Sequence, residues 1–216
     1  MYKSKLDALL PRCFEMYEYM SEHIDLLREL EPVPEIKHRL AFQSGILSFE
    51  HGLSALKLIQ DGFLSSGFAL MRPQYESLIR GFWLMFADNT TWLAKLSSAG
   101  QVKADEFKKL ETPMLGDMLK ALDKSEAPAH ILTQLHEFRT INNTPLNSFT
   151  HSGLLALIGN GNGYEPKMMY DAIRNCNAVA AINMQMLSNL TGYDEAMEPI
   201  SDLHHQFVDC LPIHHA

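Results

Sequence analysis

The chain has 216 residues, of which 46% are apolar and 20% are charged. This length and apolar content suit one domain with a substantial core and argue against disorder. The formal net charge of −8 at pH 7 argues against a general polyanion-binding surface, because nucleic-acid affinity depends largely on Lys and Arg that neutralise phosphates. A local site with two arginines is compatible with that charge.

Membrane insertion and a disulfide framework are both disfavoured. No run reaches the roughly 18 apolar residues of a membrane span, and the N-terminal segment turns acidic and aromatic where a signal peptide would stay apolar. We therefore expect a cytoplasmic protein. Cys13, Cys176 and Cys210 are odd in number, far apart and in no CxxC arrangement, so we expect reduced thiols that act as small core residues.

Apolar residues at alternating spacings of four and three predict helices at 4–30, 35–60 and 65–88. The turn at Asp61 and Gly62 is short, so the second and third helices should form a central antiparallel helical hairpin. Two sets of large side chains should face each other across it. They are Phe42, Ile46, Phe49 and Leu53 on one helix, and Tyr75, Leu78, Phe82 and Met85 on the other. Small Gly45 and Gly52 would let a neighbouring helix approach closely.

The rest of the chain also has the pattern of helices. We expect a short helix after Asn89 that ends before Gly100, and longer ones at 112–124, 128–140 and 166–190. Residues 141–153 have the composition of a loop or a broken helical turn, and three glycines at 159–163 that of a flexible turn. A last short helix follows Pro199. Because no segment alternates at period two, the sequence predicts an all-α helical bundle: a single domain of residues 1–216 with a flexible tail after about residue 211.

The third helix carries a line of charges on the edge of its apolar face. Arg72, Glu76 and Arg80 recur every four residues, so Glu76 can pair with either arginine. Pro73 leaves the carbonyl of Ala69 without its helical partner and predicts a kink beside Arg72. Gly81 makes helix formation about 1 kcal/mol less favourable than alanine would at the same position. Residues that are unfavourable inside a helix often occur where a functional site requires a distorted backbone. Close packing against a neighbouring helix would also explain Gly81.

A second polar segment contains His151, preceded by Asn147 and Ser148. A histidine in such a segment titrates near neutrality and can act as an acid or a base. We expect Arg72, Glu76, Arg80 and His151 to converge on one cleft that takes an anion such as phosphate. The alternative is that these residues only stabilise the packing of the bundle.

Histidines and a cysteine crowd the C-terminal segment, but they lack the two spaced pairs of ligands that a zinc finger needs. They are His204, His205, Cys210, His214 and His215. We predict no metal site and no cofactor.

Two motifs carry a resemblance to known proteins: RPxxExxxRGxWL at 72–84 and NSxTHxG at 147–153. They resemble a family of small bacterial helical proteins of uncharacterised function. In general build these are similar to the HEPN superfamily, whose helical bundles often dimerise and appear as RNA-cleaving toxins or abortive-infection components. HEPN nucleases place an arginine four to six residues before a histidine on one helix. Here Arg139 and His151 have eleven residues between them, so Arg72 or Arg80 would have to meet His151 in space.

This resemblance implies a homodimer that acts in phage defence or in a toxin–antitoxin pair, by cleaving RNA without a metal or by binding a nucleotide. The implied catalytic residues are Arg80 and His151, and the implied substrate-binding residues are Arg72, Glu76, Asn147 and Ser148. The alternative function is a non-catalytic homodimeric interaction protein with a protein partner. Trp83, Phe86 and Trp92 would supply apolar surface for the dimer.

Overall fold

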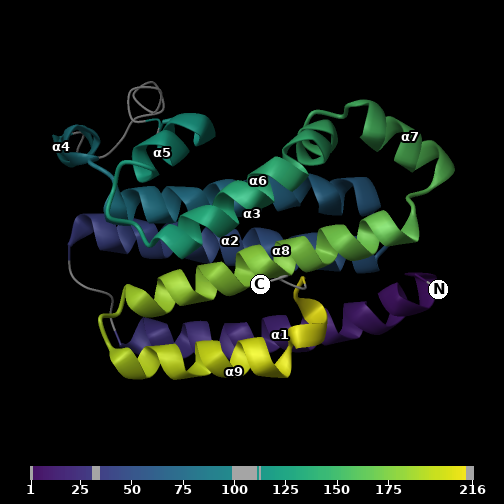
Figure 1. The fold of residues 1–216 in the computed structure, drawn as a ribbon, viewed down its shortest axis with the longest axis horizontal. Helices are drawn as coiled ribbons and strands as arrows, with labels where there is room; N and C mark the ends of the chain where they lie inside the picture. The colour runs from purple at the N-terminus through teal and green to yellow at the C-terminus, as the bar shows by residue number, and fades with distance from the viewer. Residues whose placement is uncertain (1, 31–34, 99–110, 112, 213–216) are drawn as a thin grey trace.

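A computed structural model describes residues 2–30, 35–98, 111 and 113–212, which form helices and, within these ranges, no strand (Figure 1). The elements in chain order are α1 (Tyr2–Glu29), α2 (Ile36–Gln60), α3 (Leu64–Phe86), α4 (Thr90–Ser98), α5 (Leu115–Leu122), α6 (Ala129–Thr150), α7 (Leu154–Asn162), α8 (Pro166–Asn189), η2 (Asp194–Met197), α9 (Glu198–Gln206) and η3 (Val208–Cys210). The all-α helical bundle is therefore confirmed. The tail predicted after about residue 211 falls mostly outside the described residues.

Helices α2 and α3 form the central antiparallel hairpin, as predicted. The hydroxyl of Ser44 donates to the carbonyl of Ser77, and that of Ser48 donates to the carbonyl of Gln74, both at 2.8 Å. As the residue number rises along α2 it falls along α3, which defines the antiparallel register. These bonds join the two helices along a line of small residues on α2, which are serines, glycines and alanines.

The residues that α2 turns toward α3 differ in part from those predicted. The buried line of α2 is made mainly of small side chains, whereas the larger Ile46, Phe49 and Leu53 are only half-buried. Phe49 instead packs against Tyr17 of α1, with ring centroids 5.5 Å apart. Counting apolar residues alone missed the serines, whose hydroxyls are satisfied by helix carbonyls and can therefore be buried.

At Gly67 the backbone of α2 comes close to α3, which gives a testable prediction. A Cβ atom there would lie 2.9 Å from the carbonyl oxygen of Ala55 and 2.6 Å from Cγ1 of Ile59. We expect Gly67→Ala to lower the free energy of unfolding by about 1–3 kcal/mol, because the added methyl meets backbone that cannot yield. Urea denaturation measures this change.

Gly161 in α7 provides the matched control, since a Cβ atom there would have open space around it. Gly161→Ala should leave the free energy of unfolding unchanged or raise it by up to about 1 kcal/mol, in line with helix propensity. If Gly67→Ala were as well tolerated as Gly161→Ala, the close approach of α2 and α3 would be wrong.

Helix α8 packs across the hairpin and accounts for two other glycines. A Cβ atom at Gly81 would lie 2.6 Å from Sδ of Met186, and one at Gly45 would lie 2.6 Å from a methyl group of Leu187. The amide of Asn183 also donates to the carbonyl of Gly45 at 2.9 Å. Gly81 is therefore explained by the packing of α8 and needs no ligand.

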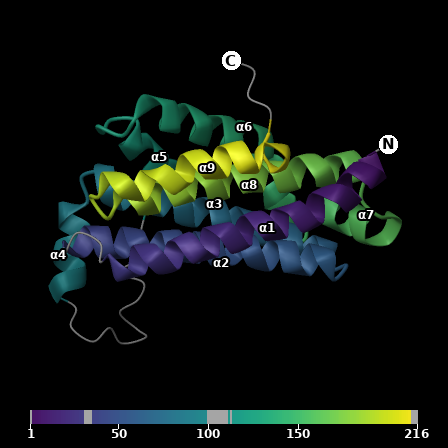
Figure 2. The ribbon, with the colours of Figure 1, turned by 90° about the horizontal axis from the view of Figure 1, so that it is seen from below.

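The remaining helices cover the hairpin on different sides. In Figure 2, α1 lies between α2 and the pair formed by α8 and α9. Helix α6 packs on α3, where the hydroxyl of Tyr75 donates to the carbonyl of Leu135 at 2.8 Å. Trp83 is buried, and its ring packs edge to face against that of Trp92, with ring centroids 5.6 Å apart. Trp83 therefore does not supply the exposed apolar surface that was expected for a dimer.

Two segments expected to be irregular are helical. Helix α6 continues to Thr150 with Pro145 inside it, and α7 occupies the glycine-rich stretch. The loop-like composition is overridden by packing, because Asn142, Leu146 and Phe149 are buried on one side of α6. The prediction of a loop or a broken helical turn at 141–153 was therefore wrong for 141–150, whereas residues 151–153 do form a turn. The flexible turn predicted at 159–163 was wrong for 159–162, and Gly163, with φ of 84°, lies in the connection after α7.

Candidate functional site

The site is built where α3 and α6 run antiparallel, and Pro73 fixes how they meet. Because proline has no N–H, the carbonyl of Ala69 lacks its helical partner. The hydroxyl of Thr150 donates to that carbonyl at 3.4 Å and also to the carbonyl of Leu146 at 2.9 Å. The helix defect expected from the sequence is thus the point at which the end of α6 attaches to α3, beside Arg72.

Arg72 is the centre of the polar cluster. Its Nε donates to Oε1 of Glu76 at 2.7 Å, one turn along α3. Its Nη1 donates to Oδ1 of Asn147 and lies 3.3 Å from Nε2 of His151. The side chains of Arg72 and Glu76 are only 23% and 28% exposed. The structure therefore brings Arg72, Glu76, Asn147 and His151 together.

The hydrogen-bonding roles in this cluster follow from the arginine. A guanidinium can only donate, so Oδ1 of Asn147 and Nε2 of His151 must both accept from Arg72. His151 is then neutral in this contact and carries its proton on Nδ1. The amide group of Asn147, Nδ1 of His151 and further N–H groups of Arg72 are all donors. A cluster rich in donors at a half-buried position complements an oxyanion.

Ser148 makes a contact within the turn after α6, and its substrate-binding role stays a prediction. Its hydroxyl accepts a hydrogen bond from the backbone N–H of Leu155 at 3.0 Å, in the first turn of α7. A Cβ atom at Gly153 would lie 2.8 Å from that hydroxyl, so only glycine leaves room for it. Ser152, in the same turn, has φ of 53°. Ser148 thus holds the connection between α6 and α7 and fixes where His151 lies.

Arg80 lies further along α3 than the rest of the cluster. From Ala69, which meets Thr150, to Arg80 is eleven residues, or about 16 Å along a helix axis. Because α6 runs the opposite way, Arg80 lies toward the start of α6 whereas His151 lies at its end. The structure pairs His151 with Arg72, and the catalytic role of Arg80 stays a prediction.

Two further residues of α6 were missed from the sequence. Arg139 and Asn143 line a small space together with Arg72 and Asn147. The space has a volume of about 10 Å³, which is no more than one water molecule occupies. A ligand would therefore bind at the rim of the cluster. Recognising that α6 continues past residue 140 would have found these residues, because they precede Asn147 and His151 at spacings of four.

Tyr75 borders the same space but is not suited to proton transfer. It is 3% exposed, and burial raises the pKa of its hydroxyl above the ordinary value of 10, although Arg139 opposes this shift. The hydroxyl already donates to the carbonyl of Leu135. His151, which is exposed at the end of α6, is the group in the cluster suited to acid–base chemistry.

The described residues also bear on a metal site and on membrane insertion. Within the part of the chain that the structure describes, no three His, Cys, Asp or Glu side chains gather as metal ligands would. His214 and His215 lie outside that part. None of the described helices is long and apolar enough to cross a membrane.

The fold and the cluster define an all-α protein with an arginine and a histidine paired between two helices. The chain belongs to the family described as "Family of unknown function (DUF6988)", which matches residues 45–213. That range contains every residue predicted above for the site. No curated protein and no solved structure matches the chain.

Proposed function

We propose that Arg72, Asn147 and His151 bind a phosphate group of RNA or of a nucleotide, and that the protein cleaves RNA without a metal ion. The observation that carries this proposal is the 3.3 Å contact between Nη1 of Arg72 and Nε2 of His151, beside an asparagine amide. A guanidinium fork matches a phosphate, and a neutral imidazole beside it can accept a proton.

The proposed reaction assigns one role to each side chain. When a phosphate oxygen accepts from Nη1 of Arg72 in place of His151, Nε2 of His151 is released and takes the proton of a ribose 2′-hydroxyl. The 2′-oxygen attacks the neighbouring phosphorus to form a cyclic phosphate, while the 5′-oxygen leaves and takes up a proton from water. The imidazolium then returns its proton to the solvent. Arg72 stabilises the negative charge that develops on the phosphate oxygens. Glu76 orients Arg72 through the bond to its Nε, and the amide of Asn147 adds a donor.

The pairing also supports the HEPN-like reading without the HEPN spacing. In that superfamily the arginine and the histidine come from one helix, whereas here Arg72 comes from α3 and His151 ends α6. The two side chains nevertheless lie side by side. On this resemblance we propose phage defence or a toxin–antitoxin pair as the setting.

A cleavage assay tests the proposal. Purified protein is incubated with total RNA in the presence of a chelator, alongside the Arg72→Ala and Arg80→Ala variants. Cleavage by the wild type that is lost in Arg72→Ala supports the proposal. If Arg80→Ala alone abolished cleavage, the catalytic arginine would be the one predicted from sequence. No cleavage by the wild type, and no RNA or nucleotide binding, would contradict it.

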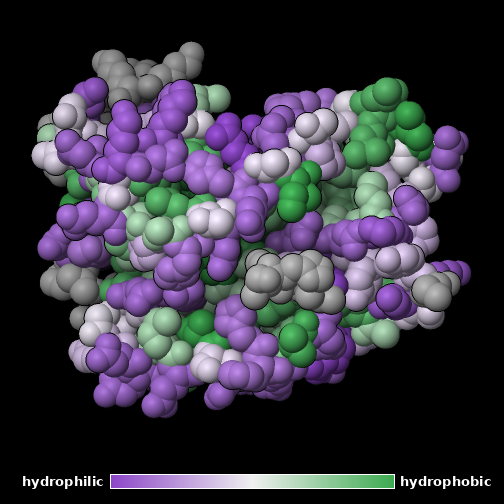
Figure 3. Space-filling view, viewed as in Figure 1, coloured by the Kyte–Doolittle hydropathy of each residue, from purple (hydrophilic) through white to green (hydrophobic). Residues whose placement is uncertain are grey.

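The second candidate is a non-catalytic homodimeric interaction protein, and an exposed apolar surface on α7 favours it. Leu154, Leu157 and Ile158 are 71%, 64% and 50% exposed and form a hydrophobic cluster over α7 (Figure 3). Exposed apolar groups in such a cluster are typical of protein–protein contacts. Since α7 begins three residues after His151, a dimer through this surface would also bring two phosphate sites near each other.

The dimer is tested by light scattering on the wild type and on Leu157→Glu. We expect a homodimer at about ten micromolar that becomes a monomer in Leu157→Glu, because a buried unpaired carboxylate opposes association. Lys57→Glu, an exposed change on α2, is the control and should leave the dimer intact. A wild type that stays monomeric up to about a hundred micromolar would rule out this surface as a dimer interface.

A further inference from the structure

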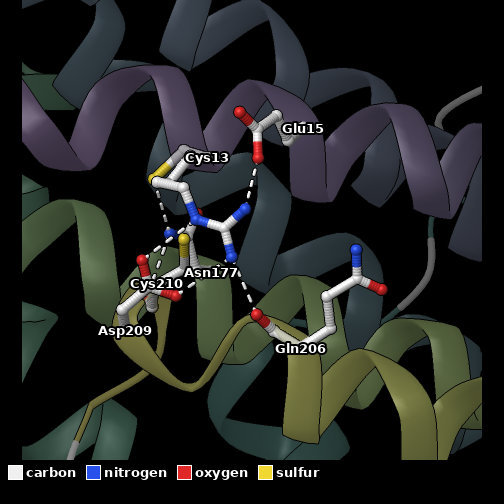
Figure 4. Close-up of polar contacts among 7 residues, drawn as sticks. Cys13, Glu15, Asn177, Gln206, Asp209 and Cys210 are labelled. Atoms are coloured by element: carbon white, nitrogen blue, oxygen red, sulfur yellow. Dashed lines mark hydrogen bonds and ion pairs between the residues drawn. The ribbon is translucent and has the colours of Figure 1, made fainter.

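Two of the three cysteines meet in the core although they come from opposite ends of the chain. Cys13 lies on α1 and Cys210 on η3, and Figure 4 shows the two side chains beside each other next to Asn177. The amide of Asn177, on α8, donates to Sγ of Cys13 and to the carbonyl of Cys210, both at 3.0 Å. Both cysteines are 0% exposed and both are free thiols.

The surroundings give the two thiols different roles. The hydrogen bonds from Cys210 and Asn177 lower the pKa of Cys13, which favours its thiolate. Cys210 is the donor in that contact, and this raises its own pKa. Cys176, which lies alone on α8, has a pKa raised by burial. Cys13 is therefore the attacking thiol of the pair, because the thiolate is the nucleophile in thiol exchange.

Access to the buried pair depends on η3, which is a single turn of three residues, Val208–Cys210. Arg12 on α1 holds this turn in place: its Nε donates to Oδ2 of Asp209 at 3.1 Å, and its Nη2 donates to the carbonyl of Gln206 at 2.8 Å. These tethers are partly exposed. The buried amide of Asn177 and the guanidinium of Arg174 also hold this segment, through the carbonyls of Cys210 and Leu211. A turn of three residues can still open locally while the helices stay packed, which would expose both thiols.

We propose that Cys13 and Cys210 are a reversible disulfide site, oxidised by a low-molecular-weight disulfide of the glutathione type. The Cys13 thiolate attacks one sulfur of the small disulfide, forming a mixed disulfide and releasing one thiolate, which takes up a proton. Cys210 then loses its proton and attacks the sulfur of Cys13, releasing the second thiol. The protein loses two electrons and two protons, and the small disulfide is reduced to two thiols.

The test equilibrates the purified full-length protein with oxidised and reduced glutathione at increasing ratios, quenches it with acid and alkylates the remaining thiols. Intact mass and digestion should show loss of two hydrogen atoms, a peptide that joins Cys13 to Cys210, and alkylated Cys176. The thermal midpoint should rise by about 5 °C or more on oxidation, because the bond closes a loop of nearly the whole chain. Reduction with dithiothreitol should reverse both changes.

Three serine variants separate this site from general thiol oxidation. Cys13→Ser and Cys210→Ser should lose the joined peptide and the thermal shift, whereas Cys176→Ser should behave as the wild type. Asp209→Asn, which removes a tether and a negative charge near Cys13, should form the disulfide several-fold faster. The proposal is overturned if the most oxidising ratio gives no Cys13–Cys210 peptide, if Cys176 is joined as often, or if Asp209→Asn does not change the rate.

Discussion

Replacing His151 with alanine is expected to slow RNA cleavage by about 10²–10⁴-fold, the usual contribution of a general acid or base. The thermal midpoint should hardly change, since the residue is exposed at the end of α6 and its ring contacts Arg72. Cleavage of a labelled RNA under single-turnover conditions measures the rate. Thermal unfolding of the same preparation measures the stability.

His130 provides the matched control for this experiment. It is also an exposed histidine of α6, but it lies in the first turn of the helix, far from Arg72. His130→Ala should cleave RNA as the wild type does. Equal loss of cleavage in both variants would indicate that histidines of α6 act through stability or general charge, and would argue against acid–base catalysis by His151.

Replacing Phe82 with alanine is expected to lower the free energy of unfolding by about 3–5 kcal/mol, the range for truncation of a buried aromatic side chain. Phe82 is 4% exposed on α3, and its ring is stacked with that of Phe86, with ring centroids 6.1 Å apart. The cost reflects lost apolar burial together with the cavity left in the hairpin. Chemical denaturation gives the change.

Phe63, which is 62% exposed just before α3, is the control for Phe82. Phe63→Ala should change the free energy of unfolding by less than about 1 kcal/mol. A Phe82→Ala variant that lost no more than the Phe63→Ala variant would show that the apolar face of α3 does not point into the core.

Periodicity predicted the helices well where one face is apolar and failed where packing overrides composition. The hairpin followed from the four-and-three spacing on both sides of Gly62, whose φ of 85° suits the turn. The end of α6 was missed because Asn, Thr and Pro favour loops locally, while the burial of Leu146 and Phe149 that keeps this segment helical is a tertiary effect.

The site was predicted in part for a related reason. Spacing along α3 placed Arg72 and Glu76 on one line, and the polar context marked His151, but the choice between Arg72 and Arg80 depends on the register of α6 against α3. That register is defined by contacts between segments far apart in the sequence, among them the bonds from Thr150 to the carbonyl of Ala69 and from Tyr75 to that of Leu135. Arg139 was missed because its relation to His151 appears only once the helix is known to continue.

The most direct test of the account measures binding of a short single-stranded RNA whose 2′-hydroxyls are methylated, so that it cannot be cleaved. Fluorescence anisotropy compares the wild type with Arg72→Gln, His151→Gln and the double variant, and with Arg28→Gln on α1 as a control. If Arg72 and His151 hold one phosphate, each single variant should weaken binding by about tenfold, while Arg28→Gln should not.

The double variant decides whether the two residues share a ligand. If they share one phosphate, the double variant should lose less binding free energy than the sum of the two single losses, by at least about 0.5 kcal/mol, because removing either residue already disrupts the shared contact. Single variants that bind the RNA as tightly as the wild type, or losses that add fully, would contradict a shared phosphate site at Arg72 and His151.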